Sequence, residues 1–345
     1  MQKIRSLLLI GAGSIGMTHL LKASNFYPDI TVVDIDSSKE DVVKKYGKTL
    51  GIDIVFADSL HSEVLKTFDL IVIANWGQDH VSTYRQVSGL SSNFLIEKPL
   101  ASNIGDLNFL REEVMRGKIV VTNLQWNYSG FKEKLIGMRE DNRLGELCGL
   151  QLFGGAKCLV TNGIHYLALA NQVIGSRPIT VIAKMDVSSI NPRRSDFLYY
   201  GGVAVWNYPD NVSLSMHLNN RSKVSETLRI LFEHGQVEVK KGTMIANKIP
   251  DGERRMLIKP AKTLHASESS ESFEAFKDLN GRDGLDVIYR RFADGNFCKT
   301  DFEPGFDSTM GILASLYSSI RENSVNLQSN NWLGEDDFDV DWNIT

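Results

Sequence analysis

Leu7-Leu-Leu-Ile-Gly-Ala-Gly-Ser-Ile-Gly16 is the stretch that decides the fold of this chain. After an apolar run, three glycines follow in G-x-G-x-x-G spacing: Gly11, Gly13 and Gly16. The apolar residues after them fall on one face of a predicted helix: Met17, Leu20 and Leu21. A strand, a glycine turn and a helix in this order are typical of a dinucleotide-binding loop. In such a loop the glycines permit a tight turn, a close approach of the pyrophosphate and close packing of the helix.

Residues beside the glycines extend this prediction to the whole cofactor. Ser14 and Ile15 begin the predicted helix, where free N–H groups favour bound phosphates. Residues 30–34 predict a second strand that ends at Asp34, at the distance where a carboxylate meets the adenosine ribose hydroxyls. Because Asp34 repels a 2′-phosphate, and Ile35 rather than an arginine follows it, the sequence favours NAD over NADP.

Length and composition limit the other possibilities. The chain has 345 residues, enough for two domains. A net charge of -4 argues against a nucleic-acid binder with a broad basic surface. Three cysteines lack the spacing of a zinc site, so we expect no metal and a reducing compartment. The first apolar run leads straight into the glycine motif and no stretch is long enough to span a membrane, so we expect a cytoplasmic protein.

Residues 1–123 alternate between predicted strands and helices. The further strands are predicted at 54–56, 68–75, 93–99 and 118–123, with helices at 37–46 and 79–87. This alternation predicts an α/β domain with a doubly wound parallel sheet. Ligands of such sheets bind at the carboxyl ends of the strands, where Asn75, Glu97 and Lys98 lie.

Glu97-Lys98-Pro99 directly follows a predicted buried strand. A lysine at the mouth of a cofactor cleft is partly desolvated and close to the positive nicotinamide ring. Both conditions favour the neutral amine, as an acid–base group requires. The residues alone leave open the alternative of a solvated lysine in a turn before proline.

Together these features resemble the glucose–fructose oxidoreductase / inositol dehydrogenase family (Gfo/Idh/MocA). The resemblance is carried by the glycine motif, Asp34, the strand 70–74 that leads to His80, and Glu97-Lys98-Pro99. It implies that Lys98 lies beside the nicotinamide and the reacting carbon, that Glu97 lies near the nicotinamide ribose, and that the Lys98–Pro99 peptide bond is cis.

One departure from the family lies upstream of His80, at Asn75-Trp76-Gly77, where the family often has Thr-Pro-Asn. Trp76 either covers the cofactor or packs against neighbouring apolar residues.

Residues 124–345 are expected to form a substrate-binding α+β domain. Consecutive predicted β segments predict a large open, mainly antiparallel sheet. They lie at 144–153, 178–185, 202–208, 212–218, 227–232, 236–239 and 255–259, with helices at 131–139, 285–292 and 308–320. In the family this sheet commonly mediates assembly, so the resemblance implies a homodimer or homotetramer. The acidic tail from Gly334 is interpreted as a mobile segment or a contact arm.

Thr161-Asn162-Gly163-Ile164-His165 opens a helix predicted to run to about residue 174. The family has Asp-x-Gly-x-His at this place, and its Asp and His act with the lysine of E-K-P on the substrate hydroxyl. Gly163 and His165 match, but Thr161 replaces the Asp. The resemblance therefore assigns acid–base chemistry to His165 and Lys98, while Thr161 can hydrogen-bond a sugar or cap the helix but cannot act as a base. Asn162 is a partial replacement for the lost contact or an ordinary helix residue, and a core histidine is the alternative for His165.

Gln125 and Trp126 fall where the chain passes between the domains, and there the family often has Arg or Asn for substrate contact. Trp126 suits stacking on a sugar face and Gln125 suits hydrogen bonds to its hydroxyls, with a packing role as the alternative.

The sequence thus predicts an NAD-dependent oxidoreductase that transfers a hydride between nicotinamide and a sugar, polyol or nucleotide-sugar carbon. We expect no metal, no nucleic acid and no membrane partner. Two alternatives stay open: an NAD-dependent glycosidase with transient oxidation, and a catalytically silent NAD-binding sensor, which the Thr161 departure supports.

Overall fold

The computed structural model describes residues 5–60, 66–141, 143–155, 157–188, 198–219, 221–240, 243–248, 271–276 and 284–329. The strand predicted at 255–259 and the acidic tail from Gly334 lie outside these ranges. The described chain divides into two compact units, the second of which begins at Ser129. The sequence put this division after residue 123 and assigned the whole remainder to the second domain. In the structure α8 (Gly284–Ala293) and the part of α9 (Glu303–Arg321) up to Leu313 belong to the first unit.

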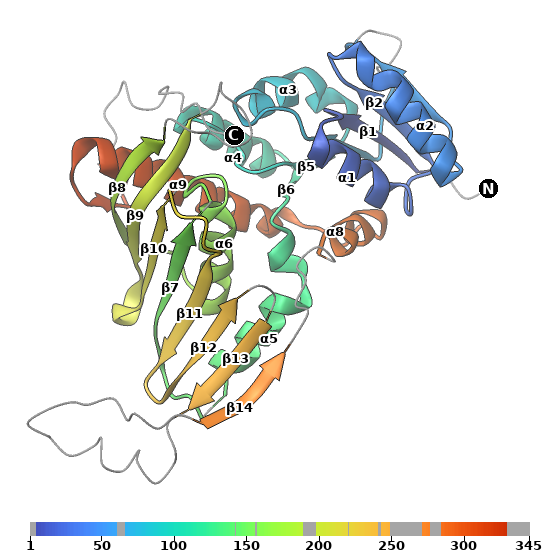
Figure 1. Cartoon of the computed structure of the whole chain (residues 1–345). Coiled ribbons are helices and arrows are strands. Elements are labelled where there is room, and N and C mark those ends of the chain that lie inside the picture. The colour runs from blue at the N-terminus through green and yellow to red at the C-terminus, as the bar shows by residue number, and fades with distance from the viewer. Residues whose placement is uncertain are drawn as a thin grey trace, which may run out of the picture. The chain divides into compact units, whose positions relative to one another are not determined.

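The described strands of the first unit form one parallel sheet in the order β3-β2-β1-β4-β5-β6 (Figure 1). The strands are β1 (Ser6–Ile10), β2 (Asp29–Val33), β3 (Ile54–Ala57), β4 (Leu70–Ile73), β5 (Asn93–Ile96) and β6 (Ile119–Thr122). The helices between them are α1 (Ser14–Ala23), α2 (Glu40–Leu50), α3 (His80–Val87) and α4 (Ile104–Met115). The predicted doubly wound fold is confirmed, and the strand order reverses between β1 and β4, the place where such sheets bind ligands.

The core of this unit is built around β1, whose five residues are all buried. A strand covered on both faces explains the continuous apolar run in the sequence. Helix α8 packs against α1 in the same core and contributes Leu285, Ile288 and Tyr289. The buried residues of α1 are Gly16, His19, Leu20 and Ala23. Leu21, which the sequence grouped on one helical face with Met17 and Leu20, is 39% exposed.

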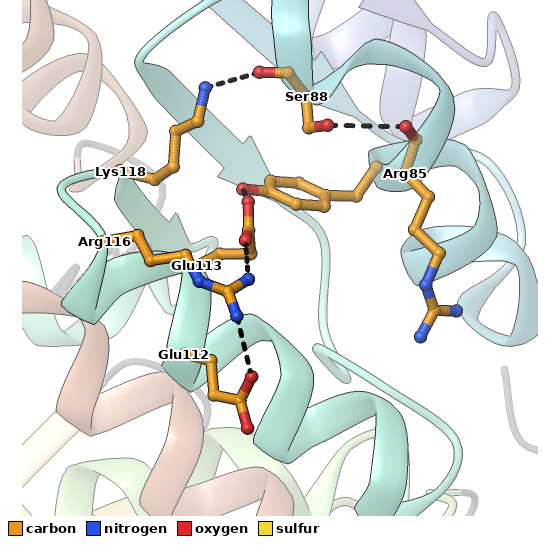
Figure 2. A network of polar contacts seen from close by, with 7 residues as sticks. Arg85, Ser88, Glu112, Glu113, Arg116 and Lys118 are labelled. Carbon is orange, nitrogen blue, oxygen red and sulfur yellow. Dashed lines mark hydrogen bonds and ion pairs between the residues drawn. The ribbon is translucent and has the colours of Figure 1, made fainter.

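A polar network lies at the opposite end of the strands, before β5 and β6 begin (Figure 2). The Lys118 ammonium donates to the main-chain oxygen of Ser88, just after α3, at 2.5 Å. At the end of α4 the Arg116 guanidinium donates to Glu113 at 2.6 Å, and the buried Tyr84 hydroxyl donates to the other oxygen of Glu113 at 3.2 Å. Because this network is remote from the carboxyl edge, its residues are suitable controls for variants made at that edge.

The second unit is built on a mixed sheet in the order β14-β13-β12-β11-β7-β10-β9-β8-β15. Its strands are β7 (Leu147–Gly155), β8 (Thr180–Ser188), β9 (Tyr199–Asn207), β10 (Ser213–Asn219), β11 (Thr227–Phe232), β12 (Gly235–Lys240), β13 (Thr243–Lys248), β14 (Glu271–Phe276) and β15 (Val325–Asn326). Strands β9 and β10 form an antiparallel hairpin across the short turn Pro209–Asn211. The sheet is mainly antiparallel, as predicted, but β7 and β10 pair in parallel.

The two faces of this sheet differ in character. Helix α6 (Gly163–Ile174) packs on β7 and β10, and α5 (Gly130–Arg139) packs against α6. The strand residues under these helices are apolar and buried, including Leu152, Trp206 and Met216. On the other face apolar side chains are exposed at Phe153 and Ile182. The long helices of the described ranges are all too polar to serve as membrane-crossing segments.

Candidate functional site

The glycine motif forms a tight turn between β1 and α1. Gly11 has a φ of +95°, and a Cβ on it would lie 2.7 Å from the main-chain oxygen of Ala74. A Cβ on Gly16 would collide with the main-chain oxygen of Gly11. By contrast, no described atom lies within 4 Å of the place where a Gly13 Cβ would be. The residues that begin α1 are exposed: Ser14 and Ile15. No side chain caps α1, so its first N–H groups and the open space over Gly13 suit a pyrophosphate.

Asp34 is joined to this turn at the end of β2. Its Oδ2 accepts the Ala12 N–H at 2.5 Å, and its Oδ1 accepts the Asp36 N–H at 2.9 Å. Because each carboxylate oxygen can accept two hydrogen bonds, Asp34 retains capacity for ribose hydroxyls. The half-buried carboxylate therefore fits the role predicted from the sequence, and it also holds the glycine turn in place.

The Glu97-Lys98-Pro99 turn follows β5 at the same carboxyl edge, and the Lys98–Pro99 peptide bond is cis, as the resemblance implies. Glu97 is 6% exposed, whereas Lys98 is half-buried. The Glu97 Oε2 accepts the main-chain N–H of Lys98 at 3.2 Å, and Oε1 accepts the amide of Asn123 at 2.6 Å. The carboxylate thus holds the lysine through its backbone.

The carboxyl group of Glu97 is ionised although it is buried. Burial by itself raises its pKa, but the hydrogen bond and charge of His19, the charge of Lys98 and the bond from Asn123 together outweigh burial and lower the pKa to about 2. Since this lies below 4.5, the value for a free glutamate, the ionised form stabilises the fold above about pH 4.5. That stabilisation is lost as the pH falls toward 2. A buried anion at this edge favours a neighbouring cation, such as a lysine ammonium or an oxidised nicotinamide ring.

His80 supports the same turn from the start of α3. Its Nδ1 lies 2.7 Å from the main-chain oxygen of Pro99, and because a carbonyl only accepts, Nδ1 carries the proton. Burial lowers the pKa of the His80 ring, which favours the neutral form. The resemblance to the family singled out His80 after the strand 70–74, and the structure places its ring against the lysine turn.

Residues after β4 complete the edge. Trp76 is 46% exposed, so a large part of its indole is accessible to a ligand. The side-chain amide of Asn75 donates to the Thr83 hydroxyl at 2.7 Å. The side-chain oxygen of Asn75 is buried and has no hydrogen-bond partner among the described residues. The side-chain carbonyl oxygen of Asn123, just after β6, is in the same condition. Buried polar atoms are seldom left unpaired, so these acceptors point to a bound polar ligand.

These features together fit an NAD molecule: the open glycine turn for the pyrophosphate, Asp34 for the adenosine ribose and the unpaired acceptors for the nicotinamide end. Within the described ranges, no group of three or more His, Cys, Asp or Glu side chains is placed to hold a metal ion.

Residues 125–128 form a short 3-10 helix after β6. Three of its side chains are half-buried: Gln125, Trp126 and Tyr128. Tyr128 packs edge-on against Phe297, with 5.9 Å between ring centroids, which makes it part of the packing of the first unit. Asn127 is buried, and neither atom of its amide has a hydrogen-bond partner among the described residues. Asn127 is therefore a further candidate for contact with a polar ligand.

In the second unit, Thr161, Asn162 and His165 lie at the start of α6. Asn162 occupies the N-cap position, without a side-chain cap bond, and Thr161 directly precedes it. The Asn162 carbonyl oxygen accepts the N–H of Cys158 at 3.0 Å, which directs this part of the side chain to its own loop. Thr161 is 8% exposed and His165 is half-buried.

The structure thus joins the predicted residues of the first unit in one connected edge, and it places Thr161 and His165 one helical turn apart in the second unit. Sequence reasoning missed His19, which contacts Glu97, and Tyr289, which contacts His19. The spacing of Gly16, His19 and Leu20 was a signal for His19, because it places a polar ring on the buried face of α1. For Tyr289 there was no such signal. Its contact with α1 arises only because α8, which follows strand β14 of the second sheet in the chain, packs in the first unit.

The first unit matches a known family. Residues 5–123 match the profile of the family described as "Oxidoreductase family, NAD-binding Rossmann fold" (Gfo/Idh/MocA). The inositol 2-dehydrogenase of Gluconacetobacter diazotrophicus is 24% identical over 115 residues. That alignment covers 33% of this chain and 34% of the relative, about a third of each.

Solved structures share the fold over most of the chain. An oxidoreductase from Agrobacterium radiobacter, in complex with NAD+, L-tartaric acid and magnesium, has a TM-score of 0.71 at 14% identity, with coverage of 94% of this chain and 99% of that one. Levoglucosan dehydrogenase, in complex with NADH and levoglucosan, has a TM-score of 0.71 at 12% identity, with coverage of 94% and 100%. Myo-inositol 2-dehydrogenase from Lactobacillus plantarum has a TM-score of 0.67 at 14% identity, with coverage of 94% and 99%. At these identities the likeness concerns the fold.

Proposed function

Because residues 5–123 match the NAD-binding Rossmann domain of the Gfo/Idh/MocA oxidoreductase family, we propose that this chain is an NAD-dependent dehydrogenase acting on a CH–OH group of a sugar, polyol or nucleotide sugar. The observation that carries the proposal is the turn that holds Lys98 on a buried, ionised Glu97 at the carboxyl edge of the Rossmann sheet. A cyclic polyhydroxy substrate is supported by the relatives, of which one is named an inositol dehydrogenase and another binds levoglucosan.

Each proposed residue has a definite task. Bound NAD would supply the hydride acceptor. Lys98 would donate a hydrogen bond to the reacting oxygen and stabilise its developing negative charge. His165 would take the hydroxyl proton during oxidation and return it during reduction. Thr161 would hydrogen-bond a substrate hydroxyl, and further contacts would come from a polar group of side chains: Gln125, Trp126, Asn127 and Asn162.

The direct test is a screen of polyols, aldoses and nucleotide sugars for substrate-dependent NADH absorbance. A dehydrogenase gives a signal that requires both substrate and NAD. If a chromogenic glycoside releases its dye without net NADH, the glycosidase alternative is correct. If NAD binds normally and no compound is turned over, the sensor alternative takes the place of the proposal.

Asp34 is expected to make the site prefer NAD over NADP. Its carboxylate would bond a free 2′-hydroxyl and repel a 2′-phosphate. Asp34→Ala should lower the affinity for NAD by about 10-fold or more, which is the contribution of one hydrogen bond to a charged group. It should also reduce the difference in affinity between NAD and NADP. Calorimetric titration with both oxidised cofactors measures this.

Asp34 also holds Ala12 in the glycine turn. Asp34→Asn is therefore needed as a second variant, because it removes the charge of the side chain and keeps its shape. Asp36→Asn is the matched control, because it removes the same charge two residues away at an exposed carboxylate. Equal or tighter binding of NADP by the unmodified protein would contradict the prediction.

We also propose that the open face of the second sheet binds a second copy of the chain. Strand register puts five exposed apolar side chains on this face: Phe153, Ile182, Val203, Leu231 and Ile245. A groove of about 420 Å³ opens beside Phe153 and His217. An apolar surface of this breadth marks an interaction site.

Phe153→Glu and Ile182→Glu are therefore expected to shift the protein toward the monomer, because each puts a charge into the apolar contact. Light scattering after size-exclusion chromatography measures the mass of the assembly. Val42→Glu, at a similarly exposed valine on α2, should leave the mass unchanged. A monomeric unmodified protein would refute the proposal.

A cytoplasmic location is the remaining part of the proposal. The three cysteines, Cys148, Cys158 and Cys298, are unpaired, as a reducing compartment favours.

A further inference from the structure

A buried chain of polar side chains runs behind Glu97. The Nε2 of His19, on α1, lies 2.8 Å from Glu97 Oε1, and its Nδ1 lies 2.7 Å from the hydroxyl of Tyr289, on α8. His19 and Tyr289 are completely buried. Neither residue can reach a substrate directly, so any effect on the site must pass through Glu97.

Glu97 receives donors from three separate segments. Oε1 accepts His19 from α1 and the Asn123 amide from the end of β6, while Oε2 accepts the main-chain N–H of Lys98. Tyr289 adds α8 to the chain through His19. A buried carboxylate costs free energy unless it is hydrogen-bonded, so these donors determine both its charge and its orientation.

The proton arrangement follows from the donors and acceptors. An ionised carboxylate only accepts, so Nε2 of His19 carries a proton. Burial raises the pKa of Tyr289 well above its usual value, so the hydroxyl keeps its proton. It donates to Nδ1 when the imidazole is neutral, and its oxygen accepts from Nδ1 when the imidazole is charged. In both states of His19 the bond to Glu97 is retained.

We propose that His19 and Tyr289 are positioning residues for Lys98, which act by keeping Glu97 charged and fixed on the backbone of the lysine. Helix α1 starts directly after the glycine turn, at Ser14, five residues before His19. Through His19, the Glu97 carboxylate therefore connects the helix that would hold the phosphates with the turn that would hold the reacting carbon. The kinetic part of this inference depends on the proposed dehydrogenase function, whereas the charge of Glu97 does not.

The groups that influence the titration of Glu97 are few. His19 contacts it directly and Lys98 follows it, while His80 interacts with it electrostatically from α3. Tyr289 stands behind His19, and Tyr27 packs edge-on against Tyr289 with 6.3 Å between ring centroids. Burial raises the pKa of Glu97, and His19 is one of the groups that lower it. When the His19 donor is removed, the pKa of Glu97 should therefore rise.

The first experiment needs no substrate. NAD affinity is measured by calorimetry from pH 4 to pH 8 in the unmodified protein, His19→Leu and His19→Gln. In the unmodified protein Glu97 should stay ionised over this pH range, so it should cause no loss of NAD affinity. In His19→Leu the NAD affinity should fall by at least about 10-fold toward pH 4, because Glu97 becomes protonated. His19→Gln should restore the flat profile, because its side-chain amide can donate to Glu97. An unchanged profile in His19→Leu would overturn the inference.

The second experiment uses Tyr289→Phe, which removes one hydroxyl and keeps the ring in the core. If the chain positions Lys98, kcat should fall by about 10- to 100-fold while KM and NAD affinity near pH 7 change little. Tyr84→Phe is the matched control, because it removes another buried hydroxyl bonded to a carboxylate, at the opposite end of the same sheet. It should lose similar stability and keep its kcat.

Equal kcat values in Tyr289→Phe and Tyr84→Phe would show that Tyr289 is only structural. If no substrate turns over, the acid profile of His19→Leu still decides whether His19 controls Glu97. Failure of the inference can therefore be distinguished from failure of the proposed function.

Discussion

Lys98→Met is expected to lower turnover by at least about 100-fold while NAD affinity changes little. Methionine keeps much of the side-chain volume and removes the charge that would stabilise the reacting oxygen. Because Lys98 contacts Glu97 through its backbone N–H, this substitution leaves that bond in place. The measurement is kcat with the best compound from the substrate screen, together with the dissociation constant of NAD.

Lys118→Met is the control for this prediction. Lys118 is another half-buried lysine of the same unit, and its ammonium donates to Ser88 and Ser91 at the far end of the sheet. The variant should lose stability, because it leaves buried carbonyls with fewer donors, but it should keep its turnover. If Lys98→Met turns over as fast as Lys118→Met, then Lys98 is only a turn residue.

His165→Asn is the second substitution with a large expected effect. Removal of a general base typically lowers turnover by about 10²- to 10⁴-fold, and asparagine cannot take the hydroxyl proton. The value of kcat/KM for oxidation by the unmodified protein should rise with pH and then level off, because only the neutral imidazole accepts a proton. This rise should be absent from any residual activity of His165→Asn.

Two further variants sharpen this result. Thr161→Asp restores the carboxylate of the family one turn before His165. Because a nearby negative charge favours the protonated imidazole, the rise of kcat/KM should move to higher pH in this variant. His234→Asn, in the turn between β11 and β12, is the matched histidine control and should behave like the unmodified protein. Full activity of His165→Asn would leave His165 as a core histidine.

The sequence by itself determined the Rossmann unit and most of its edge. The glycine turn, the apolar strands and the acid at the end of β2 are local features, because each depends on residues that are neighbours in the chain. Parallel strands then bring their carboxyl ends to one edge regardless of details, which is why Asp34, Asn75 and Glu97 could be grouped without a structure. The hairpin of β9 and β10 was predictable for the same reason, since two β runs flank a short turn.

The tertiary structure decided what depends on contacts between distant segments. The parallel pairing of β7 with β10, the packing of α8 on α1 and the exposed face of the second sheet follow from the path of the chain, which local propensity does not encode. The surroundings of single side chains belong to the same class: the side-chain oxygen of Asn162 accepts the Cys158 N–H of its own loop, and His80 lies against Pro99.

Glu97 shows the division most clearly. The sequence placed this acid at the cofactor edge, because it follows a buried strand in the E-K-P turn. Its charge depends on donors from α1 and the end of β6, with Tyr289 of α8 behind His19. A carboxylate buried among apolar strands would otherwise favour the neutral form, so only the assembled packing makes it an anion.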